Sequence, residues 1–303
     1  MHSITERAKA LGWADELSKM NPFDGLVDDP YIEKTCQKEI TDRGNFFQFA
    51  QCYLFSQALA VFLHVDNFIN TFMQATKAKR LREERVTTLE KRLPILRKLY
   101  DACISTYPVN SIIPSSADVF LDPFVQNLII TPPLTAPFTD EDLAAVGTTF
   151  PDIVFRWRKQ TEEKLLHMIT RGYGLQNAAE SALQLATTVF TCKFCSEPLT
   201  YPRVLIHNCA TKMFYYHERT GDEDLPSLRR FLQSTYWNHD NIITFDAKEI
   251  VPLIEVIELC GLDPKSATAK DMDKHNAIFE CLSCNDVRKG RCTLSWLGVV
   301  RLY

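Results

Sequence analysis

The sequence predicts a mainly α-helical protein, in which a helical body is followed by a small α+β region that binds zinc. Apolar residues recur at helix-like spacings of three and four in the first half, for example between Leu81 and Leu99. From about residue 186, cysteines come in pairs with histidines and turn residues around them, which is typical of zinc-binding modules. We therefore expect a helical body over residues 1–185 and a zinc-binding α+β region over residues 186–303.

The composition is that of a folded globular protein. Of the 303 residues, 46% are apolar and 24% are charged, which excludes intrinsic disorder and collagen-like repeats. The formal charge of −4 gives no overall reason to expect a nucleic-acid or anionic-membrane partner. The ten cysteines follow a start without an apolar leader, so their pairs indicate metal or redox sites in the cytoplasm or the nucleus.

Three helices are expected before the middle of the chain: Ile4–Met20 with Thr5 as its cap, Phe46–Met73, and Lys77–Ser105, which Pro94 should kink or split. Phe46–Val65 carries no charged residue over a length that would span a bilayer. It contains three glutamines and a histidine, which hydrocarbon would penalise, so we favour a core helix over a membrane span.

A proline-rich connector is predicted over residues 107–152, where a short docked helix is expected near Asp118–Val125 and Thr139 should cap the next helix. Helices are predicted at Phe150–Thr170 and Ala178–Phe190. In the C-terminal region we expect a strand at Val204–Ile206. Helices should follow at Ile250–Cys260, closed by Gly261, and at Thr268–Asn276.

The most specific motif is Cys192-x-x-Cys195, followed after eleven residues by His207-x-Cys209. A Cys-x-x-Cys turn presents two thiolates to one ion, and a later His and Cys complete a tetrahedral shell. On a strand, His207 and Cys209 would share a face. Four protein ligands leave no open position, so the predicted cofactor is a structural Zn²⁺. The alternative is a set of unrelated buried thiols and a core histidine.

A second candidate metal site is Cys281-x-x-Cys284 with Cys292, for which His275 or Cys260 is the candidate fourth ligand. A metal-free remnant of such a site is the alternative. Cys281 and Cys284 could also complete the first site in a composite arrangement.

Evidence for nucleic-acid binding or catalysis is weaker. Lys77–Lys98 holds nine Lys or Arg residues and three Glu, but no aromatic residues for base stacking, so a solvated face is favoured over a phosphate-binding one. The chain lacks the common nucleotide-binding, nucleophile-elbow and zincin motifs. His239 in Trp237–Asn241 resembles a His-Asn-His nuclease only faintly, and a turn residue is the favoured interpretation.

Several short motifs also resemble a large family of uncharacterised basidiomycete (mushroom) proteins, many of which carry an F-box near the N-terminus. In the C-terminal third these are Phe190–Cys195, Leu199–Pro202, Val204–Cys209, Leu259–Pro264, Asp271–Asp273, Phe279–Cys284 and Ser295-Trp296. Arg7–Trp13 and Phe150–Ile153 fit the helical part of that family. The resemblance implies a substrate adaptor of ubiquitin ligases, although this chain has no Leu-Pro-led F-box near its start.

The function predicted from these observations is that of a non-enzymatic, intracellular zinc-binding protein that contacts other proteins, with an adaptor as the leading version. A nucleic-acid-binding zinc protein is the alternative, and a zinc-dependent nuclease of the His-Asn-His type is third. The adaptor ranks first because Cys192–Cys209 contains only two basic residues, Lys193 and Arg203. No membrane partner is expected.

Overall fold

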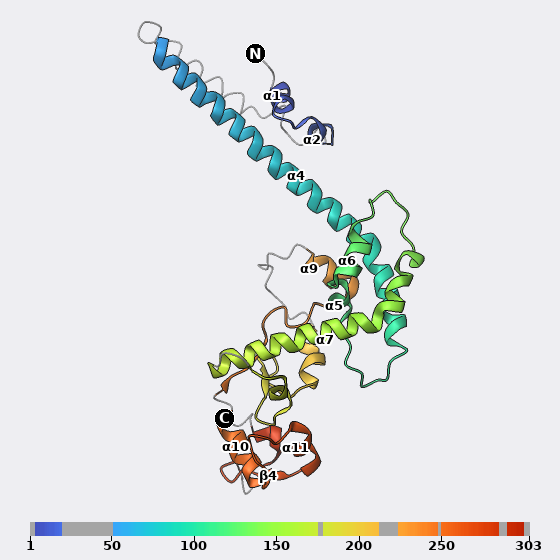
Figure 1. Cartoon of the computed structure of the whole chain (residues 1–303), viewed down its shortest axis with the longest axis vertical. Helices are drawn as coiled ribbons and strands as arrows, with labels where there is room; N and C mark the ends of the chain where they lie inside the picture. Colours follow the sequence, from blue (N-terminus) through green and yellow to red (C-terminus); the bar gives the residue numbers. More distant parts are fainter. Residues whose placement is uncertain are drawn as a thin grey trace. The chain divides into compact units, whose positions relative to one another are not determined.

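The structure is a computed structural model that describes residues 4–19, 51–174, 178–211, 224–247, 250–284 and 290–299, without the side chains of residues 4, 5, 51–65 and 68. Most of these residues are helical, as predicted for a mainly α protein, and the strands among them are short (Figure 1). The chain divides into two compact units, Met1–Arg85 and Val86–Tyr303. The predicted domain division near residue 186 stays a prediction.

The first unit packs two short helices, α1 (Ile4–Ala10) and α2 (Ala14–Lys19), against the first part of α4 (Gln51–Ile104). One continuous helix over Ile4–Met20 was expected, and this prediction is wrong. The chain breaks between α1 and α2 at Gly12, whose φ of 91° is a conformation that glycine adopts readily. The break lets Ala8 pack with Ile69 and Met73.

Two bidentate ion pairs fix these helices to α4. Arg7 donates to both carboxylate oxygens of Asp66 at 2.7 and 2.5 Å, and Arg80 donates to both oxygens of Glu16 at 2.6 and 2.9 Å. Because each carboxylate accepts hydrogen bonds from a guanidinium, the pKa values of Asp66 and Glu16 lie below their ordinary values. Their contribution to stability is therefore present near neutral pH and is lost as the pH falls through these lowered values.

Helix α4 runs without interruption from Gln51 to Ile104, so the prediction of two helices divided near residue 75 is wrong. Pro94 lies inside the helix with an exposed side chain, while its neighbours Leu93 and Leu96 are completely buried. Packing of these leucines offsets the loss of one backbone hydrogen bond at the proline. Residues 46–50 of the charge-free segment lie outside the described residues. None of the described helices combines the length and apolar character that a bilayer crossing requires.

The connector at residues 107–152 contains three short helical elements. They are α5 (Ser116–Phe120), α6 (Pro123–Ile130) and the 3₁₀ helix η1 (Asp140–Leu143). Ser115 caps α5 in a reciprocal capping box with Asp118, and Asp122 caps α6. Thr139 precedes η1 as expected. The prolines of this segment therefore lie between or at the ends of short helices, and helices still form there.

Arg92 on α4 is a completely enclosed cation that closes the C-terminal end of α6. Only 2% of Arg92 is exposed, and its guanidinium donates to the carbonyls of Ile129, Pro132 and Pro133 at 2.6–2.8 Å. The guanidinium also stacks on Phe138 at 4.7 Å. Carbonyls at a helix C-terminus lack partners within the helix, so a buried end of this kind needs an external donor. Arg92 supplies that donor.

Helix α7 (Ala144–Tyr173) connects two hydrophobic cores of the second unit (Figure 1). Phe150 and Ile153 in its first half pack in a core with residues of α4, α5 and α6. Trp157, Leu165 and Ile169 farther along belong to the core that surrounds Cys192. The apolar face of one helix therefore supports the helical part and the cysteine-rich part of this unit.

The strands before and after the first cysteine motif form a small sheet. A 3₁₀ helix, η2 (Glu180–Gln184), replaces the α-helix expected over Ala178–Phe190, where the chain instead turns to enter a strand. The antiparallel sheet has the order β2-β1-β3, with β1 at Phe190–Cys192, β2 at Pro198–Leu199 and β3 at Ile243–Thr244. Between β2 and β3 lie η3 (Arg203–Ile206), α8 (Asn208–Thr211), α9 (Leu225–Ser227) and the π-helical turn η4 (Leu228–Leu232).

The last part of the chain has a third core. It consists of α10 (Ile250–Leu259), α11 (Ala269–His275), the antiparallel hairpin of β4 (Ile278–Glu280) and β5 (Thr293–Ser295), and α12 (Trp296–Val299). Leu253, Ile257, Met272 and Trp296 are buried together in it. The two predicted helices are confirmed: Gly261 follows α10 with a φ of 72°, and Thr268 caps α11 in a capping box.

Candidate metal centre

The first Cys-x-x-Cys motif forms a tight knuckle at the end of β1. Cys192 is the last residue of β1, and its carbonyl accepts a hydrogen bond from the amide of Ser196 at 2.7 Å. Ser196 has a φ of 56°, which reverses the chain, and the Cys192 amide donates to the Glu197 carbonyl at 3.2 Å. These bonds turn the backbone around a point between Cys192 and Cys195.

The other half of the motif lies on helical turns, so the prediction of a strand at Val204–Ile206 is wrong. These residues belong to η3, in which the Leu205 amide donates to the carbonyl of Pro202 at 3.0 Å. The consecutive side chains of Val204 and Leu205 are both buried, whereas neighbours on a strand would point to opposite faces. His207 connects η3 to α8, which carries Cys209 in its first turn.

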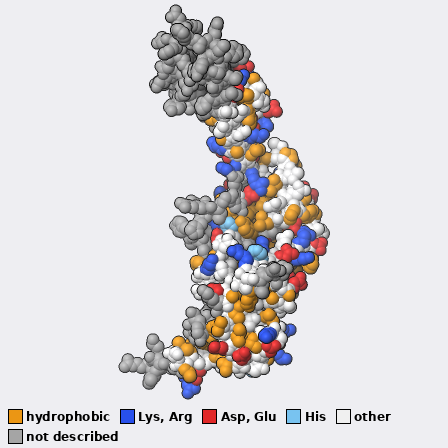
Figure 2. Space-filling view, turned by 60° about the vertical axis from the view of Figure 1, so that its left-hand side comes forward, with side chains coloured by type: hydrophobic (Ala, Val, Ile, Leu, Met, Phe, Trp, Pro, Cys, Tyr) orange, Lys and Arg blue, Asp and Glu red, His pale blue; other side chains and the backbone are white. Residues whose placement is uncertain are grey.

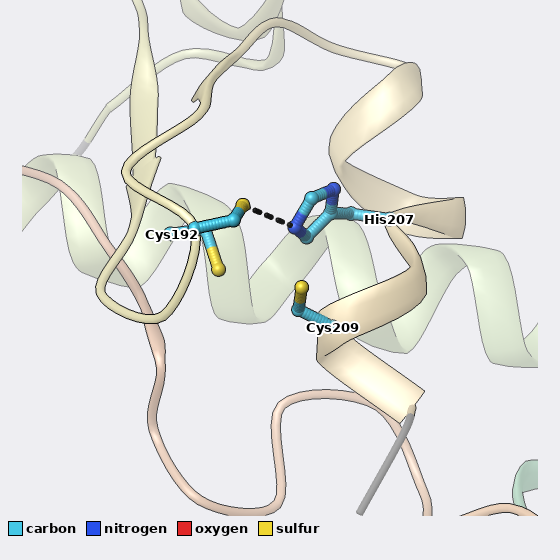
Figure 3. A group of neighbouring side chains, drawn as sticks. Cys192, His207 and Cys209 are labelled. Carbon is cyan, nitrogen blue, oxygen red and sulfur yellow. Dashed lines mark hydrogen bonds between the residues drawn. The ribbon is translucent and has the colours of Figure 1, made fainter. Parts of the chain in front are cut away.

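The four side chains converge on one point. One ligand atom each from Cys192, Cys195, His207 and Cys209 lies within 4.8 Å of the other three. Figure 3 shows the labelled side chains of Cys192, His207 and Cys209 pointing toward one another. The Cys195 sulfur lies 3.4 Å from Nε2 of His207. Zinc bonds of 2.0–2.3 Å at tetrahedral angles separate such ligand atoms by about 3.5 Å, so this group could hold a zinc ion with little movement.

The electrostatics of the group favour a bound cation. Burial and the neighbouring Cys192 and Cys195 sulfurs raise the pKa of Cys209 to about 12, so a thiolate here requires a positive charge beside it. Burial also lowers the pKa of His207, which keeps the imidazole neutral at physiological pH, as a metal ligand must be. Nδ1 of His207 lies 3.8 Å from a carboxylate oxygen of Glu197, an orientation that leaves Nε2 facing the cysteines.

Comparisons with protein-family models, with curated proteins and with solved structures found no match for this chain. The function must therefore be argued from the site itself.

A buried hydrogen-bond relay supports the group from the helical core. Asp118 of α5 accepts a hydrogen bond from the Trp237 amide at 2.9 Å, and the Trp237 indole donates to the carbonyl of Val204 at 3.1 Å. Trp237 is 3% exposed and lies in the same core as Cys192. This relay fixes η3, and with it His207. Sequence reasoning missed these residues, because Asp118 and Trp237 are 119 positions apart and neither belongs to a metal-binding pattern.

The second candidate site is brought together in part. The Cys281 amide donates to the carbonyl of Cys292 at 2.9 Å, and the Cys284 amide donates to the carbonyl of Cys281 at 3.2 Å, so the backbone places the three cysteines at one end of the β4–β5 hairpin. Nε2 of His275 instead donates to the carbonyl of Cys260 at 3.0 Å. Among the described residues, Cys281, Cys284 and Cys292 do not converge into a metal-binding group, either by themselves or with His275 or Cys260. The first group reaches four ligands without Cys281 or Cys284, so nothing in its geometry requires the composite arrangement.

The basic segment Lys77–Lys98 makes many internal ion pairs. In the first unit Lys79 pairs with Glu83, and Arg80 pairs with Glu84 as well as Glu16. In the second unit Arg92 is buried against carbonyls and Lys98 pairs with Asp140. On the face drawn in Figure 2, basic and acidic side chains are interspersed over the described residues. This pattern favours a solvated face over a phosphate-binding one.

His239, the residue on which a nuclease interpretation depends, is enclosed. Its side chain is 4% exposed, and its ring packs edge-on against Tyr236 at a centroid distance of 4.6 Å. Asn238 makes two hydrogen bonds with the backbone of Ile243, which close the turn. The turn therefore holds its side chains inward. The His217-Glu218 pair, which starts like a zincin motif but lacks the second histidine, lies outside the described residues.

Proposed function

We propose that this chain is a non-enzymatic zinc-binding protein that contacts other proteins, and that its zinc is structural. The observation that carries the proposal is the convergence of Cys192, Cys195, His207 and Cys209 within 4.8 Å. All four positions of a tetrahedral zinc ion would be filled by the protein, which leaves no position for water or substrate. Such an ion stabilises a fold and does not catalyse a reaction.

The surface beside the group supports a protein partner over a nucleic acid. Phe194, between the first two cysteines, is 57% exposed, and Ile206, next to His207, is 42% exposed. Exposed apolar side chains on a rigid knuckle are typical anchors of protein interfaces. The resemblance to F-box-type proteins makes a substrate adaptor of a ubiquitin ligase, in the cytoplasm or the nucleus, the specific version that we propose.

The zinc proposal is tested by counting ions in the full chain with native mass spectrometry. The Cys192→Ser variant should lose one equivalent of zinc, because its sulfur is a ligand and is completely buried. Cys103→Ser is the matched control: Cys103 is a partly buried thiol on α4, and its replacement should leave the zinc content unchanged. A wild-type chain that is folded and holds no zinc would contradict the proposal.

The partner proposal is tested by affinity purification with mass spectrometry from native cells. Phe194→Ala should lose the partner, whereas Phe155→Ala, which removes a ring on α7 that is 69% exposed, should retain it. Recovery of ligase scaffold components with the wild type but not with Phe194→Ala supports the adaptor. Recovery of chromatin or RNA-binding proteins by both would favour the nucleic-acid alternative.

A further inference from the structure

Helix α10 has apolar residues on two opposite faces. Of the ten residues Ile250–Leu259, only Glu255 and Glu258 are not apolar. One face is turned toward the third core, where α10 lies beside α11 and β4 (Figure 1). The buried residues of α10 are Ile250, Pro252, Leu253, Val256 and Ile257. A helix that is apolar on all sides is normally enclosed on all sides, so the exposed face of α10 is unusual.

This exposed face is one continuous stripe. Val251 is 62% exposed, Ile254 36% and Leu259 77%. Glu255 and Glu258 are exposed between them, and we name these five residues the α10 stripe. Counted from Val251 the spacings are three, four, seven and eight residues, which is the pattern of a single helix face. Single exposed apolar side chains are ordinary, whereas three aligned on one helix form a surface against which another helix can pack.

The two carboxylates determine which kind of partner fits the α10 stripe. Glu255 and Glu258 make no ion pair and no side-chain hydrogen bond with the residues that the structure describes. A second copy of the chain is disfavoured, because a two-fold axis through two antiparallel stripes would pass near Glu255, in the middle, and bring like charges together. The same charges would repel the phosphates of a nucleic acid or of an anionic membrane. Lysine and arginine side chains complement them.

We propose that the α10 stripe binds an amphipathic helix of a partner protein, whose apolar residues recur at spacings of three and four and are flanked by Lys or Arg. The apolar residues of that helix cover the three aliphatic side chains of the stripe, and its basic residues pair with the two glutamates. This surface differs from the one beside Phe194, because α10 packs in the third core and Phe194 lies on the knuckle that follows β1. Binding here requires no metal.

A synthetic helical peptide is the probe for the apolar part of the surface. It carries leucines at spacings of three and four, with lysines on both sides of them, and fluorescence anisotropy measures its binding to the full chain. We expect micromolar binding to the wild type and a loss of about tenfold for Leu259→Gln, which removes an apolar anchor. Leu81→Gln is the matched control, since Leu81 is also an exposed leucine on a helix, and should bind as the wild type does. Circular dichroism checks that both variants are folded.

Reversal of charge tests the electrostatic part. Glu255→Lys combined with Glu258→Lys should weaken binding of the lysine peptide by about tenfold and should bind the peptide in which glutamates replace the lysines. Glu163→Lys, at an exposed glutamate of α7, is the control and should change neither affinity. Phe194→Ala should also bind the lysine peptide normally, which distinguishes the two partner surfaces.

Three results would overturn the proposal. The first is equal affinity of the wild type for the lysine peptide and the glutamate peptide. The second is an affinity that Leu259→Gln leaves unchanged. The third is a wild-type dimer in analytical ultracentrifugation that Leu259→Gln converts to a monomer, which would show that a second copy of the chain occupies the α10 stripe.

Discussion

The two cysteine clusters begin with the same Cys-x-x-Cys turn but differ in what surrounds it. In the first, Cys192 is completely buried, and its partners come from the knuckle and from the η3–α8 segment across a hydrophobic core. In the second, all three cysteines belong to one hairpin, and Cys284 is exposed. An ion at the first cluster would join two separate segments of the core, whereas the cysteines of the second cluster do not converge into a metal-binding group among the described residues.

This difference determines which cluster contributes to the free energy of folding. Metal that links segments distant in the sequence contributes to the folding free energy, because the unfolded chain has no preformed site. Metal on a hairpin that backbone hydrogen bonds already hold adds little to the global stability. We therefore expect the first cluster, and not the hairpin cysteines, to control stability.

The largest effect should follow removal of metal from the first cluster. A strong chelator should cost on the order of 10 kcal/mol in the free energy of unfolding of the zinc-dependent region. Amides that bridge the knuckle, such as that of Lys193 on the carbonyl of Ile242, should lose protection in hydrogen exchange. Amides of the β4–β5 hairpin should change much less. Equal loss of protection in the two clusters would contradict the comparison.

Arg92→Met should cost about 3 kcal/mol without changing metal content. The substitution keeps much of the buried volume and removes the donors to the carbonyls of Ile129, Pro132 and Pro133, which stay buried. Urea unfolding measures the loss, and native mass spectrometry measures zinc. Arg97→Met, at a half-buried arginine on the same helix, is the control and should cost less. Loss of zinc from Arg92→Met at neutral pH would contradict this prediction, because it would show that zinc binding depends on the buried contacts of Arg92.

Asp118→Asn should cost about 2 kcal/mol and weaken metal binding at the first cluster alone. The carboxylate of Asp118 accepts bonds from the Trp237 amide and from the amide and hydroxyl of Ser115, and an amide group cannot accept all of them. The relay to Val204 should loosen as a result. Competition with a chromophoric chelator measures zinc affinity, and an unchanged affinity would show that the relay does not position His207.

The smallest effect is expected for Thr268→Ala, about 1 kcal/mol, because it removes the side-chain cap of α11. Thr268→Ser keeps the hydroxyl and should be nearly neutral. Thermal unfolding of both variants measures the difference. Neither should alter the zinc content of the first cluster, and a loss of zinc in Thr268→Ala would mean that the first cluster depends on α11.

Local signals in the sequence predicted local structure well. The Thr268 cap and the Gly261 stop each act over a few residues, and the structure confirms the two helices that they delimit. The ligand set of the first cluster was predicted from spacing, and the four side chains do converge. The identity of the bound ion stays a prediction.

The errors arose where tertiary packing outweighs local preference. Val204 and Ile206 are β-branched and favour a strand, yet the side chains of Val204 and Leu205 are both buried in the core around Cys192, which the 3₁₀ helix η3 allows. Pro94 was expected to kink or split the helix, and the structure excludes the split, because the buried leucines on either side hold α4 together. The buried contacts of Arg92 and Asp118 join residues 37 to 119 positions apart, a distance over which periodicity gives no information.

The shared helix α7 determines where the protein can be shortened. A fragment that begins at residue 186 would lack Trp157, Leu165 and Ile169, which pack in the same hydrophobic core as Cys192. Burial of each such side chain is worth about 1.5–3 kcal/mol, so their loss would leave Phe190, Leu199 and Ile243 facing water. A truncated version of this protein that is meant to carry zinc must therefore start upstream of Ala144, with the whole of α7 included.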